Sequence, residues 1–231
     1  LVERIADGLS AGEMTRVQAL VEMEVFVRRM ERGDLIAELH EAAMPELAGR
    51  SAGFSVHDPE SELRAEERVL ASLRRGLRIL RNTGGIAELV PNVGSNLVEC
   101  TPEPRSIDDV AGVPGRLFDV KGRLSVAGEP EFGASEHVAT VLLAARAAGS
   151  DARAALNLRY GPAIVDAFED QGLDTAEFDA EYEDVGTAVR DAVEAKPGAE
   201  VLYQTGAFGI EPIVYVLAPT AEAAAEQARR L

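Results

Sequence analysis

Apolar residues recur at helical spacing through the first third of the chain. Val17, Leu20, Val21 and Val27 fall near one face of a helix, because residues three, four and seven positions apart share a helix face. The same spacing recurs further along, where Pro59 suits the first position of a helix. The pattern predicts three helices, at residues 15–33, 35–47 and 60–80.

From residue 84 onward the pattern changes, and short β-rich runs alternate with Gly and Pro. Such runs occupy residues 84–100 and 113–128, and strands are expected at 200–206 and 211–219. Helices are expected at residues 135–149, 185–198 and 220–231, and residues 151–172 predict a short helix, a turn and a second helix that begins at Pro162. Alternating helices and strands predict an α/β domain with a mixed sheet.

The charge is distributed unevenly and marks a boundary. Residues 1–81 carry a net charge of −3, whereas residues 82–231 carry −14. We therefore expect two parts, a helical linker or dimerisation segment over residues 1–81 and an α/β domain over residues 82–231. The helical part contains no convincing recognition helix, so no DNA-binding module is predicted within this chain.

The chain as a whole is strongly acidic. Its formal net charge of −17 argues against direct nucleic-acid binding, because a DNA-binding surface needs clustered Lys and Arg. Lys121 and Lys196 are its only lysines. Abundant acidic residues with so few lysines suggest a halophile, in which molar salt screens surface repulsion. The acidity therefore indicates a habitat rather than a partner.

No segment predicts membrane insertion or secretion. No apolar run approaches the roughly 18 residues that a membrane span needs, and no signal peptide opens the chain, so a cytoplasmic protein is expected. The first residue is Leu1 rather than Met, from which we expect the true N-terminus to be missing. The lone Cys100 excludes an internal disulfide and a cysteine-based zinc site, and its apolar neighbours favour a buried structural thiol.

Polar residues interrupt the β-rich runs at two places. In VGSN, Gly94 permits close backbone approach, and Ser95 and Asn96 offer hydrogen bonds to a phosphate; a plain structural turn is the alternative. In DDVAGVPGR, Arg116 follows a Pro-Gly turn, and a guanidinium suits phosphate oxygens in bidentate geometry. A surface ion pair in an acidic chain is the alternative for Arg116.

Two further candidates lie at expected helix ends. In EFGASEH, Gly133, Ala134 and Ser135 lead into a helix start, where free N–H groups and the helix dipole attract anions. His137 lies beside that start and could donate a hydrogen bond or move a proton, although a histidine on a helix face is more often structural.

The segment NLRY places Asn157 and Arg159 at an expected helix end, and Arg159 is a further phosphate candidate.

Other templates for chemistry are missing from the sequence. There is no GxGxxG after a strand, no Walker A loop and no nucleophile elbow. His40 and His57 are remote in sequence from His137, so no histidine cluster has zinc spacing and no metal site is predicted.

Taken in order, five segments resemble the ThiN-type thiamine-phosphate synthase domain family. These segments run collinearly through residues 84–218, as LVPNVGSNLVEC, DDVAGVPGRLFDVKGR, PEFGASEHVATVLLAA, ALNLRY and YQTGAFGIEPIVYVLA. The resemblance implies a three-layer α/β/α sandwich with a mixed sheet, of the class-II-aldolase-like kind, here preceded by a helical segment. That fold agrees with the alternation of helices and strands.

The resemblance also implies a chemistry. The enzyme branch of the family joins hydroxymethylpyrimidine diphosphate to thiazole phosphate and releases pyrophosphate. Its expected catalytic pair falls here on Arg116 and His137, 21 positions apart. Arg116 would neutralise the leaving pyrophosphate, and His137 would donate a hydrogen bond or a proton to it. The enzyme chemistry would use Mg²⁺ with the diphosphate, but the sequence shows no dedicated carboxylate cage.

The segment before the motifs favours a different role. In the enzyme branch a pyrimidine kinase precedes this domain, whereas here residues 1–81 are helical. This layout resembles the ligand-sensing part of a haloarchaeal thiamine-responsive transcription repressor. We therefore expect a homodimeric sensor that binds thiamine phosphate without a cofactor and reaches DNA only through a missing N-terminal domain. The synthase is the alternative, and the ordered motifs disfavour a ligand-free structural domain.

Overall fold

The computed structural model of the chain describes residues 62–181 and 184–231. The predicted helices at 15–33 and 35–47, the helix start at Pro59 and the dimerisation role of residues 1–61 lie outside the described residues. The described elements follow in the order α4 (Glu62–Asn82), η1 (Ile86–Leu89), β1 (Leu97–Cys100), η2 (Ile107–Asp109), β2 (Val110–Gly112), β3 (Leu117–Asp119), β4 (Leu124–Val126), β5 (Glu131–Phe132), α5 (Glu136–Ala147), β6 (Ala154–Arg159), α6 (Pro162–Asp170), β7 (Thr175–Glu177), α7 (Val185–Ala195), β8 (Val201–Gln204), β9 (Ile213–Ala218) and α8 (Ala221–Ala228).

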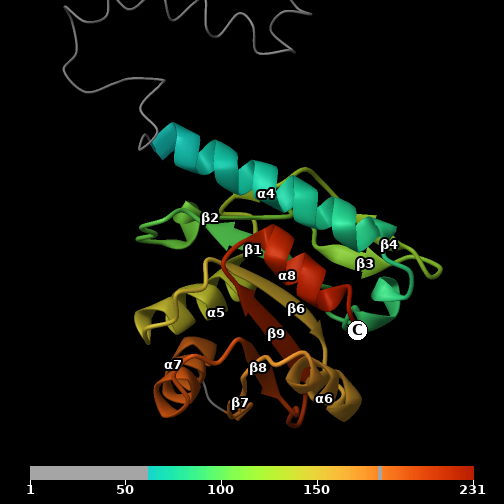
Figure 1. Ribbon diagram of the computed structural model, residues 1–231, viewed down its shortest axis with the longest axis vertical. Helices are drawn as coiled ribbons and strands as arrows, with labels where there is room; N and C mark the ends of the chain where they lie inside the picture. The colour runs from blue at the N-terminus through green and yellow to red at the C-terminus, as the bar shows by residue number, and fades with distance from the viewer. Residues whose placement is uncertain (1–61, 182–183) are drawn as a thin grey trace, which may run out of the picture. The chain divides into compact units, whose positions relative to one another are not determined.

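A seven-stranded sheet organises the described part of the chain. Its strand order is β5-β2-β1-β6-β9-β8-β7, and β3 and β4 form a separate hairpin. Neighbouring strands run antiparallel except β7 and β8, which are parallel. Helices α4 and α8 pack together on one face, and α5 and α7 pack together on the other (Figure 1). This arrangement confirms the predicted three-layer α/β/α class with a mixed sheet.

Strand β9 shows how one sheet builds two cores. Val214 and Val216 belong to the core beneath α4 and α8. Ile213, Tyr215 and Leu217 belong to the core beneath α5 and α7. Successive side chains of a strand point to opposite faces, so a strand covered on both sides reads as a continuous apolar run.

The short helix predicted before Pro162 is wrong, because those residues form strand β6. Strand β6 lies between β1 and β9, and its side chains enter both cores, Ala155 on one face and Leu156 and Leu158 on the other. Burial on both faces removes the alternation that identifies a strand, and alanine and leucine favour helices in isolation. Helix α6 does begin at Pro162, as predicted.

The other predicted elements of the domain are present. The long helix before residue 82, the helices α5, α7 and α8, and the strands β8 and β9 all form near their expected positions. Cys100 is fully buried at the end of β1, and burial raises the pKa of its thiol. None of the described helices is both long enough and apolar enough to cross a membrane.

Helix α4 is part of the α/β domain. The change in charge predicts that the domain starts at residue 82, but Val69, Leu73 and Leu80 of α4 are buried in the same core as β1 and α8. The compact unit therefore begins at Glu62. The change in net charge gives the wrong boundary because the arginines of α4 lie on its outer face. The apolar inner face of α4 decides where the helix packs.

A buried carboxylate attaches α8 to the sheet. Glu99 of β1 is 3% exposed, and its Oε2 accepts a 2.6 Å hydrogen bond from the N–H of Ala221 at the start of α8. The guanidinium of Arg153 lies 3.5 Å from the other oxygen. Burial raises the pKa of the Glu99 carboxyl, and these donors oppose the rise. The first turn of α8 is thereby held against β1, close to the middle of α4.

A substitution at Gly76 tests this packing, because α4 and α8 approach each other closely at that residue. A Cβ at Gly76 would lie 2.7 Å from the carbonyl oxygen of Ala221 and 2.8 Å from Leu97 Cδ2. On an exposed helix, Gly→Ala would stabilise the protein by about 1 kcal/mol. We expect Gly76→Ala instead to lower the free energy of unfolding by about 1–3 kcal/mol, measured by denaturant titration. Arg78→Ala on the outer face should change it by less than about 0.5 kcal/mol; stabilisation by Gly76→Ala would contradict the packing.

Candidate functional site

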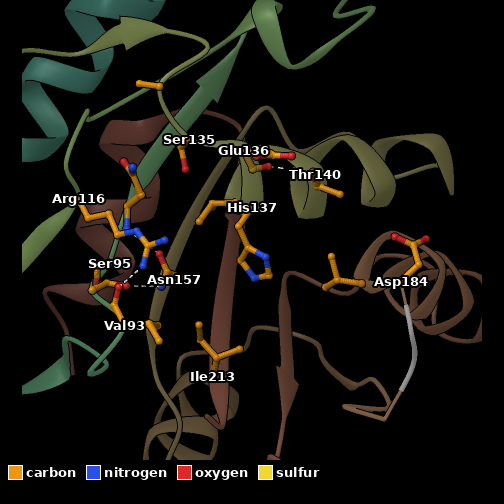
Figure 2. Close-up of a pocket in the computed structure, with 15 residues that line it drawn as sticks. Val93, Ser95, Arg116, Ser135, Glu136, His137, Thr140, Asn157, Asp184 and Ile213 are labelled. Atoms are coloured by element: carbon orange, nitrogen blue, oxygen red, sulfur yellow. Dashed lines mark hydrogen bonds between the residues drawn. The ribbon is translucent and has the colours of Figure 1, made fainter. Parts of the chain in front are cut away.

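A pocket of about 610 Å³ opens where loops and helix starts meet the sheet. Its walls are the turn at residues 93–96, Arg116, the first turns of α5, the start of α7, and side chains from β6 and β9. In the view of Figure 2, Arg116 and Ser95 lie on one side, Asp184 lies on the other, and His137 lies between them. Elements far apart in sequence thus converge on one cavity.

Two buried asparagines build the wall around the 93–96 turn. Asn157 of β6 accepts a 2.6 Å hydrogen bond from the N–H of Asn96 and donates a 3.0 Å bond to the carbonyl of Gly94. The side chain of Asn96 accepts from the N–H of Val113 at 2.9 Å and donates to its carbonyl at 2.8 Å. Each carboxamide thus serves both a backbone donor and a backbone acceptor, which satisfies groups that would be costly to bury unpaired.

Gly94 is required by the turn itself. Its φ is +84°, in the left-handed region that favours glycine, and a Cβ would lie 2.8 Å from the ring of Phe118. The Gly94 N–H donates a 2.8 Å bond to the carbonyl of Pro91. The tight turn brings the next residue, Ser95, to the pocket wall.

Ser95 offers an unused hydroxyl. The residue is 1% exposed, and its backbone pairs with Leu117 in both directions, at 2.9 and 2.7 Å. Ser95 lines the pocket, and its buried Oγ has no hydrogen-bond partner among the described residues. A buried hydroxyl without a partner costs free energy, and a polar group on a bound ligand would remove that cost.

Arg116 is held in a strained conformation. Its φ is +67°, which is uncommon for a residue with a side chain and is often found at functional sites. The guanidinium donates through Nη1 to the carbonyl of Val93, which directs the exposed cation along the pocket wall. Its remaining N–H groups suit a bidentate contact with phosphate oxygens.

The start of α5 supplies further donors. Ser135 is the N-cap, but its side chain makes no capping hydrogen bond. The first N–H groups of a helix have no partners within the helix, and the helix dipole favours an anion there. Ala134 and Ser135 line the pocket beside Arg116, so this wall is suited to an anionic ligand.

His137 lies in the first turn of α5, as predicted, and lines the same pocket. Its Nε2 lies 2.7 Å from the hydroxyl of Tyr215. Burial lowers the pKa of the imidazole, and the charge of Arg116 lowers it further. Both effects favour the neutral imidazole over the charged one.

The structure brings eight of the ten predicted binding residues together and leaves two outside. Gly94, Ser95, Asn96, Arg116, Ala134, Ser135, His137 and Asn157 line the pocket. The N–H of Gly133 is already bonded to the carbonyl of Val110 at 3.0 Å, so it cannot serve an anion. Arg159 ends strand β6 rather than a helix, and its guanidinium donates to the carbonyl of Glu88 at 3.1 Å, outside the lining.

Sequence reasoning missed four polar side chains of the site, one of them Thr140, which lines the pocket. Glu136 and Asp184 line the pocket, and Tyr215 lies against His137. Asp184 could have been identified as an N-cap, because it directly precedes a helical pattern, but nothing local places it opposite Arg116. Tyr215 lies in an apolar strand whose neighbours are known only once the sheet is formed.

The residues that the structure describes contain no group of three His, Cys, Asp or Glu side chains that could hold a metal ion. Asp184 already accepts hydrogen bonds from the N–H and hydroxyl of Thr187, at 2.8 and 2.6 Å, and from the N–H of Gly186 at 3.3 Å. These bonds lower the pKa of Asp184 and use its oxygens to cap α7. The donor set of the pocket thus fits an anion better than a resident cation.

Comparisons with known proteins give a consistent result. The family model "Thiamine-phosphate synthase ThiN" matches residues 72–230. The thiamine-phosphate synthase ThiN of Methanothermobacter thermautotrophicus is 29% identical, and the match covers 70% of this chain and 91% of that protein. The bifunctional thiamine biosynthesis protein ThiDN of Methanocaldococcus jannaschii is 31% identical, and the match covers 66% of this chain but only 37% of that protein. The crystal structure of the C-terminal domain of protein MJ0236 aligns with a TM-score of 0.66 and 29% identity, over 71% of this chain and 93% of that one.

These relatives correct one expectation from the sequence. The helical segment expected before the motifs favours a non-catalytic sensor. The names of both curated relatives, however, refer to thiamine biosynthesis, and one of them is the synthase itself. The preference for a non-enzyme is therefore wrong, and the repressor interpretation has no support among the relatives. The order of segments along the chain gave the wrong functional class, because it describes what precedes the domain and not the chemistry of the pocket.

The asparagine pair can be tested by truncation. In Asn157→Ala, the N–H of Asn96 and the carbonyl of Gly94 lose their partners while buried. We expect the free energy of unfolding to fall by about 1–3 kcal/mol or more, measured by denaturant titration, with faster hydrogen exchange at the Asn96 amide. Asn82→Ala at the exposed end of α4 is the matched control and should have little effect. Equal stability of both variants would contradict the role of the pair.

The influence of Arg116 on His137 can be measured by NMR titration. We expect the pKa of His137 to lie below its ordinary value of about 6.5 and to rise in Arg116→Ala, because the neighbouring positive charge opposes protonation. Arg78→Ala, which removes a cation from the outer face of α4, should leave the pKa unchanged. An unchanged pKa in Arg116→Ala, or a fall, would contradict the electrostatic effect of Arg116 on His137.

Proposed function

We propose that this chain, which belongs to the thiamine-phosphate synthase ThiN family, is a thiamine-phosphate synthase. Its substrates would be hydroxymethylpyrimidine diphosphate and thiazole phosphate. In the reaction, the thiazole nitrogen forms a bond to the methylene carbon of the pyrimidine. The bond from that carbon to the diphosphate oxygen breaks, and its electron pair leaves with pyrophosphate. The products are thiamine phosphate and pyrophosphate.

One observation carries this proposal: cationic and hydrogen-bonding donors meet on one side of a single pocket. Arg116, Ser95 and the first turn of α5 all line it, and the Ser95 hydroxyl has no hydrogen-bond partner in the described part of the chain. A leaving pyrophosphate gains negative charge as the carbon–oxygen bond breaks, and fixed donors stabilise that charge without having to reorganise. This wall is where we place the diphosphate.

The size and polarity of the rest of the pocket agree with this assignment. A volume of about 610 Å³ lies within the range of pockets for small organic ligands. Val93, Val138, Val185 and Ile213 give the pocket apolar surface beside the donors, which suits flat heterocyclic rings. We therefore place the pyrimidine and thiazole rings against these side chains, with the carbon under attack close to the donor wall.

His137 acts on the same leaving group. Because its pKa is lowered by burial and by Arg116, the neutral imidazole predominates at pH 7 and carries a single N–H. A hydrogen bond from that N–H to a diphosphate oxygen would stabilise the developing charge. Arg116 supplies the formal positive charge.

Mg²⁺ enters this proposal only with the substrate. Because the oxygens of Asp184 cap α7, Glu136 is the remaining carboxylate among the described pocket residues. Mg²⁺ commonly keeps several waters and binds through substrate phosphates with few carboxylates. A magnesium requirement, if present, would therefore follow the concentration of the Mg²⁺–diphosphate complex.

Turnover of the full chain with both substrates tests the proposal, with thiamine phosphate and pyrophosphate measured in equal amounts. We expect Arg116→Ala to lower kcat/KM by about 10²–10³-fold and His137→Ala to lower it by about 10²-fold, because each removes a donor to the leaving group. Arg78→Ala is the matched arginine control and should keep wild-type activity. Absence of turnover by the wild-type chain, or full activity of Arg116→Ala, would refute the assignment.

A further inference from the structure

Tyr215 lies directly against the histidine of the pocket. It occupies the middle of β9, on the face that packs against α5 and α7, and it is 1% exposed. Its hydroxyl is 2.7 Å from His137 Nε2, and the two ring centroids are 6.1 Å apart. The ring of Phe178 packs on another side, with a centroid distance of 6.0 Å. The phenol is thus held by the core with its hydroxyl directed at one imidazole nitrogen.

The direction of this hydrogen bond follows from the burial of the phenol. Among the described residues, the Tyr215 hydroxyl contacts His137 as its only hydrogen-bond partner. If His137 Nε2–H donated to the phenol oxygen, the buried O–H would have no acceptor, at a cost of about 1–3 kcal/mol. If the phenol donates, both groups are satisfied. Burial also raises the pKa of Tyr215, so the phenol keeps its proton.

We infer that Tyr215 is a positioning residue, whose hydroxyl donates to Nε2 and thereby fixes His137 as the neutral tautomer with its proton on Nδ1. Among the described residues, Nδ1 has no hydrogen-bond partner of its own, and the imidazole lines the pocket. The Nδ1–H is therefore the donor left for a ligand. That the ligand is a diphosphate rests on the proposed function, whereas the tautomer rests on the contact with Tyr215.

This assignment also explains which form of His137 the site favours. In an imidazolium both nitrogens are donors, so the Nε2–H would compete with the Tyr215 O–H and one of them would be unsatisfied. Arg116 on the same pocket wall opposes a second positive charge, while Glu136 and Asp184 are the acidic groups that line the pocket. Tyr215 thus keeps His137 as a hydrogen-bond donor to the leaving group, and the reaction does not require it to lose a proton.

The tautomer can be observed directly in the wild-type chain. In ¹⁵N-detected or long-range ¹H–¹⁵N NMR spectra at neutral pH, we expect Nδ1 of His137 to show a pyrrole-like shift and Nε2 a pyridine-like shift. His137→Gln assigns the signals among the three histidines of the chain. The reverse pattern, with the proton on Nε2, would overturn the inference whatever the activity of the protein. This measurement needs no variant of Tyr215 to fold.

The effect of the contact is measured with Tyr215→Phe, which removes only the hydroxyl. We expect both tautomers of His137 to be populated, and the affinity for inorganic pyrophosphate, measured by calorimetry on the full chain, to fall about 2- to 10-fold. Tyr203→Phe is the matched control: Tyr203 stacks on Tyr160, with centroids 5.8 Å apart, and should change neither quantity. Retention of a single Nδ1–H tautomer and of full affinity in Tyr215→Phe would refute the role of Tyr215.

The two proposals fail in distinguishable ways. If the wild-type chain shows the Nδ1–H tautomer but no turnover, the synthase assignment fails and the role of Tyr215 stands. If turnover is observed while His137 carries its proton on Nε2, the inference about Tyr215 fails and the synthase assignment stands. A fall in kcat for Tyr215→Phe with little change in KM would indicate that the hydrogen bond helps to stabilise the transition state.

Discussion

The pocket depends on the hydrogen bonds of two buried carboxamides. Asn157 belongs to the central strand β6, and through Asn96 it fixes the 93–96 turn to the sheet and to the segment at Val113. Both asparagines are buried, so the backbone groups they contact have no access to water as an alternative partner. Moving the turn would leave several buried polar groups unpaired at once. The position of Ser95 and the course of the chain toward Arg116 follow from this network.

A second support comes from the opposite layer. Helix α5 presents its first turn to the pocket while Val138, Val141 and Leu142 bury its inner face in the core shared with β9. The contact between His137 and Tyr215 therefore joins a helix start to the middle of a strand. Side chains carried by packed helices and strands keep their geometry better than side chains carried by loops alone. Here the loop residue Arg116 and the helix residue His137 line the same cavity, to which strands β6 and β9 also contribute side chains.

Much of this arrangement could be predicted from the local sequence, but some of it could not. Strong periodic patterns predicted α4, α5 and α7, and the motifs around Gly94, Arg116 and His137 identified about half of the residues that line the pocket. Strand β6 was missed because burial on both faces erases alternation. Asp184 and Tyr215 became part of the site through the order of strands and helices, which no local pattern encodes. A choice between sensing and catalysis was beyond the motifs, since one pocket would serve either.

Strand β9 also connects the site to the accuracy of sheet formation. Tyr215 pairs with Asn157 across the β6–β9 ladder and with Leu202 across β8, and its neighbours in the strand are Val214 and Val216. Because alternate residues of a strand face opposite layers, a slip of one residue would turn the phenol toward α4 and α8 and place a valine beneath His137. Such a misfolded sheet would still bury aliphatic side chains on both faces. The contact between His137 and the Tyr215 hydroxyl therefore forms only in the correct strand register. Burial of aliphatic side chains alone would not select that register.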